Sequence, residues 1–142
     1  MTSPLTQDEL DAALARENYL ADETLVTALY LALELGKPLL LEGAPGVGKT
    51  EVANTLAKIL GRQCVRLQCY EGIDATKAVY DWDHARQLLH VRVTERSGTV
   101  ETSDLYDEKF LIEMPLLKAL RNADTTVLLI DEIDRADDAF EA

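Results

Sequence analysis

The chain has 142 residues, of which 47% are hydrophobic, and this suits a single domain with a modest core. Its formal net charge of −12 argues against a nucleic-acid partner, because such partners are bound through a broad basic face. No apolar run reaches the roughly 18 residues of a membrane span, and residues 1–9 lack the features of a secretory signal. Cys64 and Cys69 are not spaced as zinc ligands, so we interpret them as free thiols of a reducing, cytoplasmic compartment.

Two helices are predicted near the N-terminus. The sequence Thr-Gln-Asp-Glu at residues 6–9 fits a capping box, so a helix is expected to start there and run to about Arg16. Asp22 is placed to cap a second helix over residues 23–35, and Gly36 is expected to end it. Both predictions rest on local signals that need no tertiary contact.

A strand, a glycine-rich loop and a helix are predicted next. Residues 43–50 read Gly-Ala-Pro-Gly-Val-Gly-Lys-Thr, which fits the phosphate-binding pattern G-x-x-x-x-G-K-[ST]. The apolar run at 38–42 predicts a buried strand before the loop. Residues 51–60 predict a helix after it, which Gly61 is expected to end. This context of strand, loop and helix is the one that the motif requires.

The residue types of the loop suit a triphosphate. Backbone N–H groups at a helix N-terminus attract the phosphate oxygens, and glycines let the backbone approach them closely. Lys49 is expected to reach the β- and γ-phosphates, and the Thr50 hydroxyl to bind Mg²⁺. Tyr19, in the connector between the first two helices, is a weaker candidate for contact with the base. We expect nucleotide contacts from Gly43, Ala44, Pro45, Gly46, Val47, Gly48, Lys49, Thr50 and Glu51.

The middle of the chain is less regular. Residues 64–68 alternate between apolar and polar side chains and predict a second strand. Residues 75–88 are expected to hold one or two short helices around Trp82, which we interpret, like Tyr80, as a packing residue. Residues 89–93 fit a short strand or the end of a helix equally well.

A second motif follows near the end of the chain. Pro115 suits the first turn of a helix, and residues 126–130 predict a third, buried strand that ends at Asp131 and Glu132. An apolar strand that ends in aspartate is typical of a Walker B site, whose carboxylate binds Mg²⁺. A second carboxylate can accept a proton from water and orient it for attack. We therefore expect Thr50 and Asp131 to hold the metal, and Glu132 and Lys49 to be catalytic.

These two motifs resemble those of AAA+ ATPases, and other stretches resemble the MoxR group in particular. The more specific ones are Arg-Leu-Gln-Cys-Tyr-Glu-Gly-Ile-Asp at 66–74 and Tyr-Asp-Trp-Asp-His-Ala-Arg-Gln-Leu-Leu at 80–89, supported by residues 37–43 and 130–136. The resemblance extends from about Asn18 to the end of the chain. It is nearest to members linked to carbon monoxide dehydrogenase maturation.

The resemblance implies a function and a fold. MoxR-type proteins use ATP and Mg²⁺ and act as hexameric, chaperone-like ATPases in the maturation of a client enzyme or the insertion of its metal. They often act with a partner that carries a von Willebrand factor A domain. The implied fold is an α/β P-loop NTPase, with three αβα layers and a parallel sheet in the order 5-1-4-3-2.

The resemblance also implies elements that this sequence does not contain. A complete member continues with a fourth and a fifth strand, an arginine finger and a helical lid. We therefore expect residues 1–36 to form helices that lead into a partial AAA+ core at 37–142, in a fragment with weak turnover. The strands at 38–42 and 126–130 would then lack the fourth strand that normally lies between them.

Two alternatives remain open on the residues alone. A small P-loop kinase shares the phosphate loop, although it has less need of Glu132 because its acceptor is not water. A non-enzymatic fragment that binds nucleotide, or a sibling ATPase, is the other alternative. Detection of a phosphorylated small molecule would favour the kinase, and far-UV circular dichroism with gel filtration would show whether the fragment forms a compact monomer.

Overall fold

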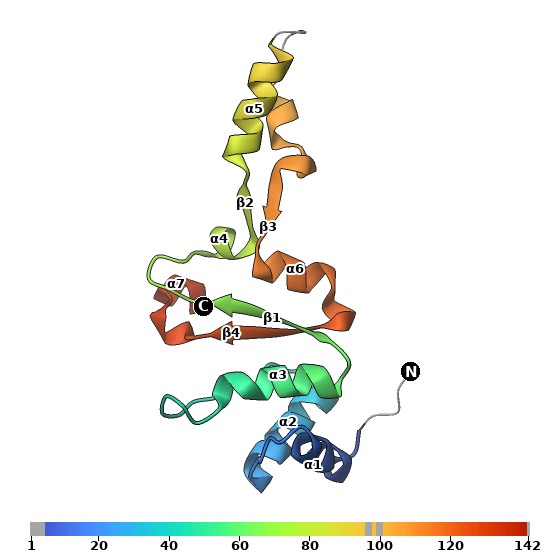
Figure 1. The fold of residues 1–142 in the computed structure, drawn as a ribbon. Helices are drawn as coiled ribbons and strands as arrows, with labels where there is room; N and C mark the ends of the chain where they lie inside the picture. The colour runs from blue at the N-terminus through green and yellow to red at the C-terminus, as the bar shows by residue number, and fades with distance from the viewer. Residues whose placement is uncertain (1–4, 96–97, 99–100, 142) are drawn as a thin grey trace. The chain divides into compact units, whose positions relative to one another are not determined.

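The computed structural model describes residues 5–95, 98 and 101–141 (Figure 1). The chain divides into two compact units, each of which is described by itself. The first comprises Met1–Cys64 with Thr125–Leu129, and the second comprises Val65–Asp124 with Ile130–Ala142. Among the described residues, no helix is both long and apolar enough to cross a bilayer.

The first unit contains helices α1 (Gln7–Arg16), α2 (Glu23–Leu35) and α3 (Lys49–Ile59) (Figure 1). The capping box of α1 forms as predicted. The Thr6 hydroxyl accepts a hydrogen bond from the Glu9 N–H at 3.3 Å, and the Glu9 carboxylate accepts one from the Thr6 N–H at 2.8 Å. Asp22 caps α2, and a left-handed Gly36 ends it. These local predictions are confirmed.

The three helices share one hydrophobic core. Leu10 and Leu14 of α1 are fully buried, and they cluster with Val26 and Leu29 of α2 and Val52 of α3. The partly buried Tyr19, Leu33, Leu41, Leu56 and Ile59 are among the side chains that pack against this cluster. The helix that follows the phosphate loop is therefore fixed by the two N-terminal helices.

Leu14→Ala is expected to lower the free energy of unfolding by about 2–5 kcal/mol, because it removes buried methyl groups and leaves a cavity in this core. Leu20→Ala is the matched control: Leu20 is 91% exposed, so its truncation should change stability by less than about 0.5 kcal/mol. Chemical denaturation followed by circular dichroism measures both. Equal effects of the two substitutions would contradict the position of this core.

The predicted strand at residues 38–42 is wrong. Residues 37–44 form no strand, and Leu40 is 68% exposed. A strand is stabilised by the hydrogen bonds that it exchanges with a neighbour. The described part of the chain offers this segment no paired strand, so its apolar sequence alone does not hold it extended.

The second and third predicted strands are confirmed. They correspond to β1 (Gln63–Gln68) and β4 (Thr126–Asp131), which pair with each other and run parallel (Figure 1). Beyond β1, the Cys69 N–H donates to the Asp131 carbonyl at 2.9 Å. Val65 and Leu67 of β1 are buried, whereas Arg66 and Gln68 face outward, as the alternation predicts. The predicted α/β class with parallel strands is therefore confirmed.

The segment between β1 and β4 contains a small antiparallel pair that the sequence did not indicate. Strands β2 (Tyr80–Trp82) and β3 (Leu111–Glu113) pair with Trp82 opposite Leu111. The undecided residues 89–93 are helical and belong to α5 (His84–Thr94). The packing role of Tyr80 and Trp82 is confirmed, because their rings meet edge to face at 5.9 Å. The remaining elements are α4 (Ala75–Val79), α6 (Pro115–Arg121), α7 (Asp138–Glu141) and the 3-10 turns η1 (Thr102–Tyr106), η2 (Glu108–Phe110), η3 (Ala123–Thr125) and η4 (Ile133–Arg135).

Candidate functional site

The glycine-rich loop has the backbone conformation that its sequence suggests. Gly46 and Gly48 have φ values of +84° and +89°, a region that side chains with a Cβ rarely adopt. Gly48 is also the N-cap of α3, so the loop runs directly into the positive end of the helix dipole. The loop itself is largely exposed, and Val47 is 60% exposed. Main-chain groups of residues 43–48 can therefore face an anion.

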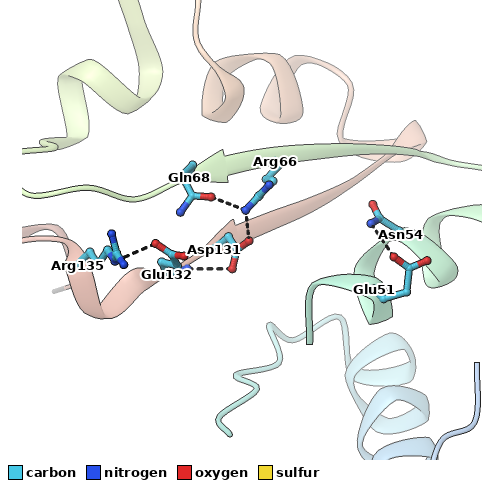
Figure 2. Close-up of polar contacts among 7 residues, drawn as sticks. All are labelled: Glu51, Asn54, Arg66, Gln68, Asp131, Glu132 and Arg135. Atoms are coloured by element: carbon cyan, nitrogen blue, oxygen red, sulfur yellow. Dashed lines mark hydrogen bonds and ion pairs between the residues drawn. The ribbon is translucent and has the colours of Figure 1, made fainter. Parts of the chain in front are cut away.

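Lys49 is folded onto this loop. Its ammonium donates to the carbonyl oxygens of Gly43 at 2.6 Å and Ala44 at 2.7 Å. These bonds hold a positive charge within the loop at the first turn of α3. On the same helix, the Glu51 carboxylate accepts a hydrogen bond from the Asn54 side chain at 3.4 Å (Figure 2). The Lys49 ammonium and the backbone of the predicted loop therefore lie together at the N-terminus of α3, where they can attract an anion.

The connector between α1 and α2 brings an aromatic ring to the loop. A Cβ at Gly48 would lie 3.6 Å from the Tyr19 ring and 3.7 Å from its hydroxyl oxygen. Asn18 turns the chain with a φ of +61°, and the Tyr19 N–H donates to the Leu14 carbonyl at 2.9 Å. Burial raises the pKa of Tyr19, and the carboxylates of Asp22 and Glu51 raise it further. A larger side chain at position 48 would press against this ring.

The acidic pair lies at the end of β4 (Figure 2). One carboxylate oxygen of Asp131 is 2.6 Å from Nη2 of Arg66, on β1. The other accepts the N–H of Glu132 at 3.0 Å. The side chain of Asp131 is only 18% exposed, so its carboxylate is partly shielded from water. Each of its two oxygens has a hydrogen-bond or ion-pair partner.

Glu132 has an unusual backbone conformation. Its φ is +54°, in the left-handed region that costs a residue with a Cβ roughly 1–2 kcal/mol. Its carboxylate is 2.9 Å from Nε of Arg135, one turn further along η4 (Figure 2). Strain of this kind concentrates at functional positions, where the surrounding structure holds the residue in place. The geometry supports a special role for Glu132.

Sequence reasoning missed Arg66. The residue lies within the stretch at 66–74, but its pairing with Asp131 depends on β1 and β4 being neighbours. One signal was present: Arg66 and Gln68 alternate onto the same face of β1, and the guanidinium donates to the Gln68 side chain. The loop residues lie in the first unit and the acidic pair in the second, so the proposed sharing of Mg²⁺ by Thr50 and Asp131 stays a prediction.

The chemistry of the acidic pair fits a magnesium ion held mainly by a nucleotide. In the described parts of the chain, no group of three or more His, Cys, Asp or Glu side chains could hold a metal by itself. Mg²⁺ in nucleotide sites is bound by one or two protein oxygens together with phosphates and water. Asp131 supplies a suitable carboxylate. Cys69, which directly follows β1, is buried, and burial together with the Asp131 and Asp134 carboxylates raises the pKa of its thiol.

The sequence of the chain is similar to one protein family and to several known proteins. Residues 38–140 match the family described as AAA domain (dynein-related subfamily). An uncharacterized protein of Staphylococcus saprophyticus is 29% identical over 125 residues, which cover 87% of this chain and 41% of that protein. Dynein axonemal heavy chain 12 of mouse and of human is 49% identical over 51 residues, which cover 36% of this chain and 2% of the dynein chain. The chain thus spans less than half the length of these relatives. No solved structure matches it significantly.

Proposed function

The chain belongs to the AAA domain family of the dynein-related subfamily, and on this premise we propose that it binds ATP and hydrolyses it as a MoxR-type AAA+ ATPase. Its fold is the αβα P-loop NTPase fold of that family, with β1 and β4 in the parallel sheet. The observation that carries the proposal is the position of the Lys49 ammonium, held by two loop carbonyls at the first turn of α3.

Each site residue has a proposed task. The backbone N–H groups of residues 43, 44 and 46–48 and the Lys49 ammonium bind the phosphates, while Pro45, which has no N–H, contacts the nucleotide without donating. Glu51 begins the exposed face of α3 beside them. Thr50 and Asp131 hold Mg²⁺, which neutralises charge that develops on the phosphates. Glu132 accepts a proton from the attacking water and orients it. Tyr19 packs beside the loop and contacts the base of the nucleotide.

The MoxR assignment rests on the stretches at 66–74 and 80–89. We propose a chaperone-like role in the maturation of a client enzyme or in the insertion of its metal, in the cytoplasm. In such an assembly, the chain would form part of a hexamer and act with a partner that carries a von Willebrand factor A domain. Residues 1–36 would lead into the ATPase core at 37–142.

Titration with a fluorescent ATP analogue in the presence of Mg²⁺ tests the proposal. We expect saturable binding that unlabelled ATP displaces and that weakens when EDTA removes the metal. Absence of saturable binding would contradict nucleotide binding. A phosphorylated small molecule appearing in a screen of acceptors would favour the kinase alternative instead.

Turnover by this chain alone is expected to be slow. We assign none of its residues as an arginine finger, a group worth roughly 10³–10⁵ in rate in related phosphoryl transfer. Measuring phosphate release at micromolar protein concentration tests this expectation. Turnover of several ATP molecules per second would show that the chain supplies every group that hydrolysis needs.

A further inference from the structure

The Asp131 carboxylate has a resident cation. Nη2 of Arg66 lies 2.6 Å from Oδ2 of Asp131, a distance typical of a strong, charge-assisted hydrogen bond. Figure 2 shows the guanidinium between the side chains of Asp131 and Gln68, and it donates to the Gln68 carboxamide as well. The cation is therefore held at two points, by its own strand and by β4.

The two partners differ in their exposure. The Asp131 side chain is 18% exposed, whereas that of Arg66 is 52% exposed. The carboxylate is fixed by the strand end and by the Glu132 N–H, but the guanidinium stands on a long, flexible stem that reaches water. Arg66 can therefore leave the pair and become solvated at little cost, while Asp131 stays in place.

We propose that Arg66 is a positioning residue that competes with Mg²⁺ for the Asp131 carboxylate, so that binding of the metal releases Arg66. This inference rests on the proposed function, in which Asp131 holds Mg²⁺. A magnesium ion needs its ligand oxygen at roughly 2.1 Å and near-octahedral surroundings, which a guanidinium on the same oxygen obstructs. Two cations at one carboxylate also repel each other.

Competition has a thermodynamic consequence. If Mg²⁺ weakens the hold of Asp131 on Arg66, then Arg66 weakens the hold of the site on Mg²⁺ by the same factor. Partly exposed ion pairs contribute up to about 1 kcal/mol, which corresponds to roughly fivefold in affinity. Arg66 would then neutralise the Asp131 carboxylate when no metal is bound. It would also lower the affinity of the site for Mg²⁺ alone, so that the metal binds mainly together with the nucleotide.

The test compares the affinity for a fluorescent ATP analogue in Mg²⁺ with its affinity in EDTA. The dissociation constant in EDTA divided by that in Mg²⁺ is the ratio that measures the contribution of the metal, and it rises as the metal binds more tightly. We expect Arg66→Gln, which removes the charge and retains the polar end, to raise this ratio about two- to fivefold. In an Asp131→Asn background, Arg66→Gln should have no effect on the ratio, because the contested carboxylate is gone.

The matched control is Arg86→Gln, which makes the same charge change on α5, where the guanidinium lies 4.0 Å from Asp83. It should leave the ratio unchanged. Thermal unfolding of each variant separates competition from a merely structural pair. Suppose that Asp131→Asn lowers the ratio, so that the metal site is present. If Arg66→Gln then fails to raise the ratio, or raises it no more than Arg86→Gln does, the inference is overturned and the proposed function stands. If nucleotide binding is absent, or the ratio does not depend on Asp131, the proposed metal site fails and this inference fails with it.

Discussion

Lys49→Ala is expected to weaken binding of the Mg²⁺ complex of ATP by roughly 30- to 4,000-fold. Removing one partner of a desolvated charge pair costs about 2–5 kcal/mol, and each 1.4 kcal/mol is tenfold in affinity. The ammonium donates to the carbonyls of Gly43 and Ala44, so it already lies against the backbone of the loop that is proposed to bind the phosphates. Fluorescence titration with a labelled ATP analogue gives the dissociation constants.

The matched control is Lys58→Ala. Lys58 is exposed in the last turn of the same helix, α3, so its removal changes the net charge equally and leaves the loop intact. Its effect on the dissociation constant should stay within about twofold, the scale of a screened surface charge. Similar losses in both variants would mean that Lys49 acts through the overall charge of the protein. Thermal unfolding of Lys49→Ala checks that the loop carbonyls tolerate the loss of the ammonium.

The parts of the fold that sequence predicted correctly are those that local chemistry decides. The capping box at residues 6–9, the Asp22 cap and the left-handed Gly36 each need only a few neighbouring residues. The phosphate loop is similarly local, because its glycines and lysine act within eight consecutive positions. The exposed loop and the start of α3 therefore agree with the pattern closely.

The errors concern strands, whose existence depends on partners that are distant in sequence. Residues 38–42 have the composition of a buried strand, but composition does not supply a ladder of hydrogen bonds. The opposite error occurred at β2 and β3, which are three residues each and too short to show a period. Their pairing joins residues about thirty positions apart, which no local signal predicts.

The candidate site divides in the same way. Asp131 and Glu132 were predicted from the strand end that precedes them, whereas their cationic partners were not. Arg135 is only three residues from Glu132 and follows a common helical spacing, so the sequence carried a signal for that pair. Arg66 meets Asp131 only because β1 lies beside β4, a neighbour relation that requires the fold.

Glu132→Gln is expected to lower ATP hydrolysis by roughly 10²–10⁴-fold, the usual contribution of a general base, with little effect on nucleotide affinity. Glutamine retains the length and an oxygen acceptor but cannot take a proton from water. The substitution keeps a Cβ at the left-handed position, so the backbone strain at φ +54° is unchanged. Its loss of the charge pair with Arg135 affects an exposed contact that is worth up to about 1 kcal/mol. Single-turnover hydrolysis of radiolabelled ATP measures the rate even where turnover is slow.

Asp134→Asn is the control for charge, because Asp134 is exposed two residues further along, in the 3-10 turn η4 that Glu132 precedes as N-cap. It removes an equal charge without touching the carboxylate that is proposed to act on water, and its rate should match that of the unaltered chain. A normal rate in Glu132→Gln would exclude Glu132 as the base. If the unaltered chain hydrolyses ATP no faster than Lys49→Ala, the ATPase proposal itself is contradicted, and nucleotide binding without hydrolysis remains. The rate and the affinity together therefore separate a catalytic carboxylate from one that only binds the metal or holds the end of β4.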